Sequence, residues 1–239
     1  MTQVSSTTAK PSFDPKTQPV VGACNLAPLS EQELTAEFIR TAFTQAKRIN
    51  WQVEPLYTHA FVKDFREHPQ SIQSAVCVGI IQHQGTLHVL FTKRAEHLPH
   101  HAGQVSFPGG RIEQQDADAV AAALRETHEE VGIAPAFIEP IAEQPIFLTS
   151  TRFAMRPVVS LLHEGYRLQP NPQEVAEIFV VPLVELLNPR RHTIHHLPRR
   201  FGREGAYFSI AWEGQFIWGA TAALVRNLYH FLSAAARQL

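Results

Sequence analysis

The sequence is poor in cysteine and in long apolar segments, and each shortage excludes a class of protein. Two cysteines in 239 residues can form at most one disulfide, which is typical of a reducing compartment. The longest nearly apolar stretch, residues 178–187, is far shorter than the roughly 20 residues that a bilayer span needs, and the polar N-terminus lacks the apolar core of a signal peptide. We therefore expect a cytoplasmic protein without a membrane partner.

The sequence also has almost no net charge. The 21 Lys and Arg residues nearly balance the 22 Asp and Glu residues, so no overall positive field attracts nucleic acid. We expect a small anionic molecule, held by local groups, as the partner. What the sequence does have is 44% hydrophobic residues, enough for a proper core.

The chain divides into a polar start and one long domain. Residues 1–29 are rich in Ser, Thr, Gln and Pro without an apolar period, which predicts a disordered or loosely ordered N-terminal tail. Residues 30–239 then form a single domain. A capping box at Ser30 and Glu33 predicts an N-terminal helix over 31–49, and we expect a C-terminal helix over 220–237. Strands are predicted at 74–82, 87–92, 141–148, 157–162, 177–181 and 206–212, so the pattern indicates an α+β fold with a mixed β-sheet flanked by helices.

A helix predicted over residues 117–131, ended by Gly132, carries the strongest functional signal. Glu126, Glu129 and Glu130 lie at i, i+3 and i+4 and therefore share one face. Their charges repel one another in the last turn, where the helix dipole also disfavours acids. A divalent cation would remove this conflict. Oxygen ligands without Cys or His at matching spacing favour Mg²⁺ or Mn²⁺ over zinc.

The alternative is a solvated acidic helix end, in which Arg125 and Glu129 form an ordinary i,i+4 ion pair. The preceding loop favours a ligand site instead. Its glycines, Gly103, Gly109 and Gly110, let the backbone approach a ligand closely, so a backbone carbonyl can join a metal shell. Taken alone, however, Pro-Gly-Gly is an ordinary turn signal.

Loop and helix together resemble the Nudix box, a glycine followed by an Arg-Glu-hydrophobic-x-Glu-Glu-x-Gly helix. Thr127 replaces the usual aliphatic residue, and Asp116 takes the place of an upstream glutamate. The spacing from the glycine to the arginine is one residue longer than in the generic box, as in the coenzyme A pyrophosphatases. The resemblance implies a Nudix-type α/β/α sandwich. The matching residues are Gly110, Arg125-Glu126, Glu129-Glu130 and Gly132-Ile133.

The coenzyme A branch is also similar upstream and downstream of the box. Residues 90–110 keep most of a frame that ends in Phe-Pro-Gly-Gly, and residues 216–221 look like bacterial members of this branch. Two polar positions differ: Ala95 replaces a serine, and Pro99 replaces an arginine. The second change removes an anion-binding guanidinium, which weakens the link to coenzyme A.

The resemblance implies an activity and a role for each matching residue. Family members hydrolyse a nucleoside diphosphate linked to another group, and this branch cuts coenzyme A or acyl-coenzyme A into 3′,5′-ADP and (acyl-)4′-phosphopantetheine. Glu126, Glu130 and the Gly109 carbonyl would bind the metal, Glu129 would bind it or orient water, and Arg125 would orient the glutamates. The general base is open between Glu126, Glu129 and Glu174. Substrate contacts are expected from Lys93, Arg94, Phe107 and Arg111.

Other functions stay open on the sequence alone. One is a pyrophosphatase for ADP-ribose or NADH. Another is a non-catalytic nucleotide- or RNA-binding module, which the three intact glutamates argue against. The sequence also leaves open whether the protein is a homodimer. His192, His195 and His196 suggest a zinc site, but they lie among arginines without a nearby cysteine, so we predict a solvated loop there.

Overall fold

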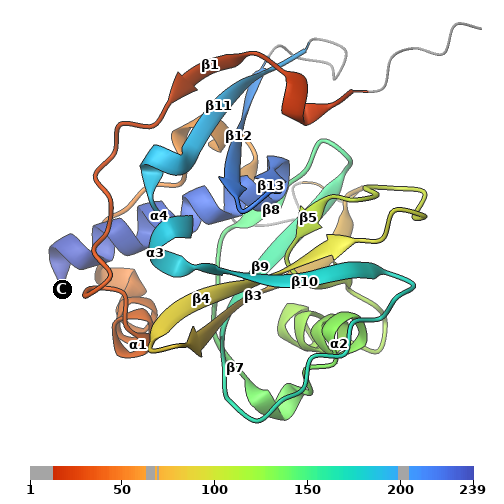
Figure 1. The fold of residues 1–239 in the computed structure, drawn as a ribbon. Helices are drawn as coiled ribbons and strands as arrows, with labels where there is room; N and C mark the ends of the chain where they lie inside the picture. The colour runs from red at the N-terminus through yellow and green to blue at the C-terminus, as the bar shows by residue number, and fades with distance from the viewer. Residues whose placement is uncertain (1–12, 63–67, 69, 199–204) are drawn as a thin grey trace, which may run out of the picture.

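The computed structural model describes residues 13–62, 68, 70–198 and 205–239, and a nine-stranded mixed sheet forms its centre (Figure 1). The order is β10-β4-β3-β9-β8-β2, with β5 beside β4, β6 beside β3 and β7 beside β9. β3 and β9 pair in parallel, and the other pairs are antiparallel. The strands are β2 (Phe61–Val62), β3 (Ile72–His83), β4 (Thr86–Arg94), β5 (Val105–Ser106), β6 (Gly109–Arg111), β7 (Ile138–Glu143), β8 (Ile146–Leu148), β9 (Phe153–Leu162) and β10 (Val175–Pro182).

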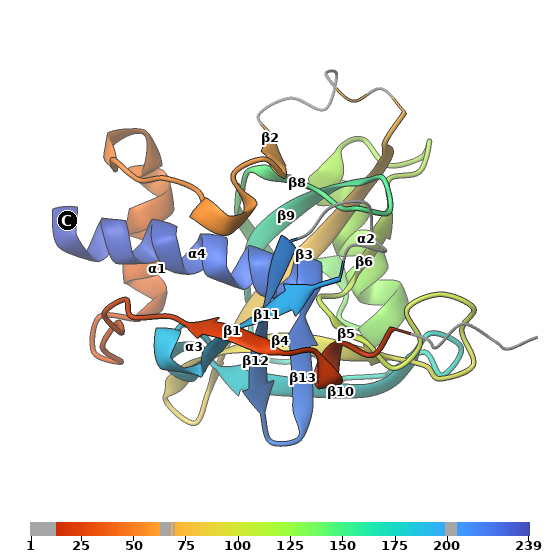
Figure 2. The same ribbon diagram turned by 90° about the horizontal axis from the view of Figure 1, so that it is seen from above.

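Helices cover both faces of this sheet, as Figure 2 shows. One face of β3 packs with α2 in one apolar cluster, and the other face belongs to a second cluster that includes α1 and α4. The predicted α+β sandwich with a mixed sheet is therefore confirmed. The α-helices are α1 (Ala36–Thr44), α2 (Ala119–Val131), α3 (Leu183–Leu186) and α4 (Gly219–Gln238), and the short 3-10 helices are η1 (Pro15–Thr17), η2 (Ala46–Arg48), η3 (Pro55–Tyr57), η5 (Pro135–Phe137) and η6 (Pro189–Arg191). Among the described residues, no helix is long and apolar enough to cross a membrane.

A second sheet, which the sequence did not predict, is antiparallel with the order β1-β11-β12-β13. It shows that the expected tail over 1–29 is wrong for residues 13–29, while residues 1–12 lie outside the described part. β1 pairs with β11, and the Tyr229 hydroxyl donates to the Ala27 carbonyl at 2.6 Å. The two segments of each pair are distant in sequence, so no local pattern predicts these contacts. The strands are β1 (Val20–Ala23), β11 (His192–Leu197), β12 (Gly205–Trp212) and β13 (Gln215–Trp218).

The predicted solvated loop around His192 is also wrong where the structure describes it. His192 and His195 are buried within β11. The His192 Nε2 atom lies 2.8 Å from the Leu186 carbonyl, and the His195 Nε2 atom lies 2.8 Å from the Ser209 hydroxyl. Residues 199–204 lie outside the described part.

Local signals set the ends of the helices with unequal success. The Asp118 carboxylate accepts from the Ala121 amide at 2.8 Å and begins α2. Gly132 ends this helix with φ 79°, as predicted. The first helix is shorter than expected because Thr35 caps it. The Ser30 amide does donate to the Glu33 carboxylate at 2.9 Å, but this contact closes a turn before the helix.

Candidate functional site

The glycine loop passes directly against the acidic helix. β6 pairs with β3, so that Gly109 lies opposite Val76. A Cβ atom at Gly109 would clash with the Ala75 carbonyl oxygen, and one at Gly110 would clash with the Glu126 carboxylate. The close backbone approach predicted from the sequence is therefore present. Gly109 meets backbone atoms and has no room for a side chain, whereas a side chain at Gly110 would displace the Glu126 carboxylate.

Arg125 organises the carboxylates around it. Its guanidinium makes a bidentate contact with Asp116 at 2.9 Å and reaches both Glu126 and Glu129 at 2.9 Å. A further bond goes to the Arg111 carbonyl at 3.0 Å. The hydrogen bonds from Arg125 hold the pKa of Asp116 below its usual range. The ordinary i,i+4 pair with Glu129 is thus present, but as one part of a larger arrangement that can orient two glutamates.

Glu130 differs from its neighbours because it is buried and one of its carboxylate oxygens has no hydrogen-bond partner among the described residues. Its side chain lies within the fold at 2% exposure, and its Oε2 atom has no hydrogen-bond partner among the described residues. Burial raises the pKa of Glu130 to about 8, against the opposing charge of Arg94, while the charges of Glu126 and Glu174 raise it further. A backbone hydrogen bond from Gly109 is the other opposing contribution.

Glu174 lies close enough for its charge to act on Glu126 and Glu130. Its charge raises the pKa of both Glu126 and Glu130, although burial is the main reason for the raised pKa of each. The turn that carries it is tied to α2, because the Asn171 amide donates to the Glu130 carbonyl at 2.9 Å. The Ala95 amide donates to the Glu174 carbonyl at 2.8 Å. The structure therefore brings Glu174 near enough for its charge to act on Glu126 and Glu130.

These residues fit a divalent cation in their chemistry. Within the described part of the chain, no three His, Cys, Asp or Glu side chains are grouped closely enough to hold a metal as they stand. The buried and unpartnered Glu130 oxygen nevertheless needs a cation or a donor. The Glu126 carboxylate lies against the backbone of Gly110, next to Gly109. Hard oxygen donors of this kind suit Mg²⁺ or Mn²⁺.

The predicted substrate contacts lie in different environments. Arg94 is half-buried, and its charge acts on Glu130. Lys93 is half-buried and lies 3.8 Å from the Glu96 carboxylate, and Arg111 is exposed on β6. Of these three side chains, Arg94 is the one whose charge acts on a glutamate of the site, whereas Lys93 pairs with Glu96 and the Arg111 guanidinium lies 6.0 Å from the centre of the Phe153 ring.

Phe107 was predicted to contact the substrate, but the structure places it in the core. It is 3% exposed and stacks on Phe91, with ring centroids 4.8 Å apart, in the core beneath the loop. From the sequence, an aromatic ring in a glycine-rich signature could contact a ligand. The Phe107 ring instead packs in the core and anchors the loop there. Thr127, the departure from the aliphatic pattern, is likewise buried, and its hydroxyl donates to the Ala123 carbonyl at 2.6 Å.

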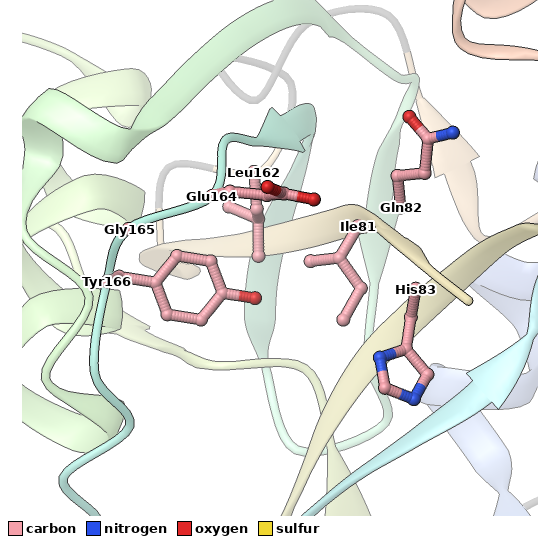
Figure 3. Close-up of a pocket in the computed structure, with 7 residues that line it drawn as sticks. All are labelled: Ile81, Gln82, His83, Leu162, Glu164, Gly165 and Tyr166. Carbon is pink, nitrogen blue, oxygen red and sulfur yellow. The ribbon is translucent and has the colours of Figure 1, made fainter. Parts of the chain in front are cut away.

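A cavity of about 280 Å³ lies at the end of β3 that carries Ile81, away from the glycine loop. Figure 3 shows the side chains that line it. Its wall begins at Ile81, five residues beyond the partner of Gly109, which is roughly 16 Å along the strand. No residue of the candidate site lines this cavity. The lining residues are Ile81, Gln82, His83, Leu162, Glu164, Gly165 and Tyr166.

A second buried cluster of charged side chains was not predicted. Arg226 on α4 donates to the Glu54 carboxylate at 2.8 Å and to the His192 Nδ1 atom at 3.1 Å. His230 donates to the same carboxylate at 2.8 Å, and the Cys24 sulfur lies 3.2 Å from Arg226. The cluster joins residues up to 202 positions apart, so sequence spacing gives no signal for it.

The family model and the curated relatives agree on one family. The family model described as NUDIX domain matches residues 71–201, more than half of the chain. The uncharacterized Nudix hydrolase NudL of Pectobacterium atrosepticum is 39% identical over 159 residues, which cover 66% of this chain and 82% of that protein. The protein of the same description from Escherichia coli K12 is 36% identical over 163 residues, covering 68% and 84%. Among solved structures, the MutT protein from Methanosarcina mazei Go1 has a TM-score of 0.42 and 17% identity, covering 70% of this chain and 94% of that one.

Proposed function

This chain belongs to the Nudix hydrolase family, and from that premise we propose that it hydrolyses the diphosphate bond of coenzyme A or acyl-coenzyme A. Family membership makes it a pyrophosphohydrolase of small nucleotide-derived substrates, which generally depends on a divalent cation. The observation that supports a working hydrolase is the buried Glu130 carboxylate, unpartnered at one oxygen beside the glycine loop.

We assign the cation, Mg²⁺ or Mn²⁺, to the Glu126 and Glu130 carboxylates and the Gly109 carbonyl. When bound, such an ion neutralises diphosphate charge and lowers the pKa of bound water. Glu129 is half exposed and held by Arg125, so it serves as a further ligand or orients water. Arg125 keeps Glu126 and Glu129 in place, and Asp116 in turn fixes Arg125.

Arg94, Lys93 and Arg111 are assigned to the substrate phosphates. Their positive charge balances a diphosphate that becomes more negative during attack at phosphorus. The proton of the attacking water needs an acceptor. Glu174 is a candidate with Glu126 and Glu129, because its charge acts on Glu126 and Glu130. Its turn is bonded both to α2 and to the loop that begins at Ala95.

The choice of coenzyme A is supported by the signature residues between 90 and 110. The change at Ala95 does not remove an exposed group, because Ala95 is buried and acts through its backbone amide. Pro99 is exposed, so an arginine at this position would have been accessible from solvent. The missing guanidinium keeps ADP-ribose and NADH as alternative substrates.

Product analysis tests the proposal. The purified protein is incubated with coenzyme A, acyl-coenzyme A, ADP-ribose or NADH, with Mg²⁺, Mn²⁺ or EDTA, and the products are separated by chromatography. We expect 3′,5′-ADP from coenzyme A in the presence of metal only. AMP from ADP-ribose or NADH alone would move the assignment to those substrates. Binding without turnover of any diphosphate would favour the non-catalytic module.

Two further expectations belong to this proposal. A cytoplasmic location rests on the low cysteine content, and Cys24 and Cys77 are both free thiols. Homodimer formation stays a prediction, which light scattering after size-exclusion chromatography would test.

A further inference from the structure

The segment Phe216 to Thr221 is the part of the family signature that the proposed active site does not use. It forms the end of β13 and the start of α4. The Thr221 hydroxyl is buried and donates to the Val105 carbonyl at 3.1 Å. We propose that Thr221 is a positioning residue that fixes the glycine loop, an inference that rests on the proposed function.

The start of α4 leaves this hydroxyl free to reach another segment. A threonine within a helix commonly bonds to the carbonyl four residues earlier. For Thr221 that residue is Ile217, which lies in β13 and not in the helix. Gly219, with φ 62°, lets the chain pass from strand to helix at this point. The hydroxyl can therefore donate across to β5.

The Val105 carbonyl needs this donor. The Arg94 amide donates to the Gln104 carbonyl at 2.9 Å, and the Ser106 carbonyl lies 3.4 Å from the Thr92 hydroxyl. Carbonyls alternate in direction along a strand, so the one between them points away from β4. Val105 is itself buried, and a buried carbonyl without a partner is unfavourable.

The Val105 carbonyl lies four positions before Gly109, whose own carbonyl is a proposed metal ligand. The loop is also held at Pro108, whose carbonyl accepts from the Cys77 amide at 2.8 Å. The next residue, Gly109, bonds to Glu130 through its backbone, and Gly110 lies directly against Glu126. A shift of the loop therefore changes the position of a metal-binding carbonyl relative to both carboxylates. Since the bond at Pro108 would remain, loss of the Thr221 contact should weaken the site and not destroy it.

The test compares Thr221→Val, which keeps the shape and removes the donor, with Thr221→Ser, which keeps the donor. Thr221→Cys adds a weak donor of similar size, in case the valine variant does not fold. Ser233→Ala is the matched control. It removes another buried hydroxyl of α4, one that accepts from Arg237 and lies roughly 18 Å further along the helix. Mn²⁺ binding is measured by calorimetry, the Mg²⁺ dependence of hydrolysis by kinetics, and Tm without metal by calorimetric melting.

We expect Thr221→Val to raise the Mn²⁺ dissociation constant and the Mg²⁺ concentration for half activation about tenfold, the lower end of effects seen for outer residues of metal sites. Thr221→Ser should stay close to wild type and Thr221→Cys should lie between. Ser233→Ala should change Tm only. Wild-type Mn²⁺ affinity in Thr221→Val, or in Thr221→Cys if only that variant folds, would overturn the inference, as would equal weakening in Ser233→Ala. A wild-type protein that neither binds Mn²⁺ nor hydrolyses a diphosphate would instead overturn the proposed function.

Discussion

Two glutamates are buried almost equally, Glu130 against the glycine loop and Glu54 against α4, at 2% and 3% exposure. Burial raises the pKa of both. For Glu54, the hydrogen bond from His230 and the charge of Arg226 outweigh burial and lower the pKa overall. For Glu130, burial prevails and the pKa rises to about 8. The comparison indicates that the Glu54 carboxylate, with all its partners in place, holds the fold together. The raised pKa and unpartnered oxygen of Glu130 are what we expect of a carboxylate that binds a ligand.

The largest effect should come from replacing the buried Glu130 carboxyl. Glu130→Gln should lower metal-dependent hydrolysis at least about a thousandfold, equivalent to roughly 4 kcal/mol, because a buried metal ligand is lost. Tm should stay the same or rise, since an amide avoids the proton uptake that folding imposes on a buried carboxyl with a raised pKa. Kinetics and thermal melting measure both. If the purified variant keeps its activity, Glu130 is not a metal ligand, and a marked drop in Tm would make it structural like Glu54.

The next effect should come from removing a partner of the satisfied charge. Arg226→Gln leaves the Glu54 carboxylate buried without its arginine, with His230 and the Leu56 amide as its remaining partners, and should reduce the free energy of unfolding by about 3 kcal/mol. Urea denaturation measures it. The double variant Glu54→Gln/Arg226→Gln is the control, because removing both charges should restore part of the loss. If Arg226→Gln is as stable as wild type, the cluster contributes little and the contrast with Glu130 disappears.

A smaller effect should appear as a pH dependence of stability. Burial lowers the pKa of His192 to about 4, and the charge of Arg226 lowers it further, although the hydrogen bond to the Leu186 carbonyl opposes the shift. The unfolded chain takes up this proton near pH 6.5 and the folded protein only near pH 4, so acid favours unfolding between these values. We expect a loss of about 2 kcal/mol from pH 7 to pH 5.

His192→Gln is the control for this pH dependence. Glutamine can donate to the Leu186 carbonyl and accept from Arg226 without titrating, so this part of the pH slope should vanish. His195→Gln, on the same strand, should keep the slope. Equal slopes in wild type and His192→Gln, measured by denaturation at several pH values, would contradict the assignment of the proton to His192.

The helix of the candidate site was predictable because its signals are local. The Gly132 end and the spacing of Glu126, Glu129 and Glu130 all lie within seven residues and follow from helix geometry alone. The close approach of the glycine loop was also predictable. Whether each glutamate binds metal stays a prediction, because ligands cannot be told from neighbours by spacing.

The parts that were not predictable depend on contacts between distant segments. Glu54 and Arg226 are 172 positions apart, and either alone in the sequence looks like an ordinary surface charge. β1 is four residues long and mostly exposed, so its order comes from β11 and not from its own composition. Phe107 was misassigned because a motif shows which residues occur together but not which way a side chain points.

The pairing of β1 with β11 has a practical consequence for anyone who shortens this protein. A variant starting at residue 30, where the sequence places the domain boundary, would lack β1 and leave the outer backbone groups of β11 open. Unpaired strand edges recruit strands from other molecules. Loss of the Tyr229 contact to Ala27 would further loosen that side. Such a variant is therefore prone to self-association during purification, and keeping residues 13–29 avoids this.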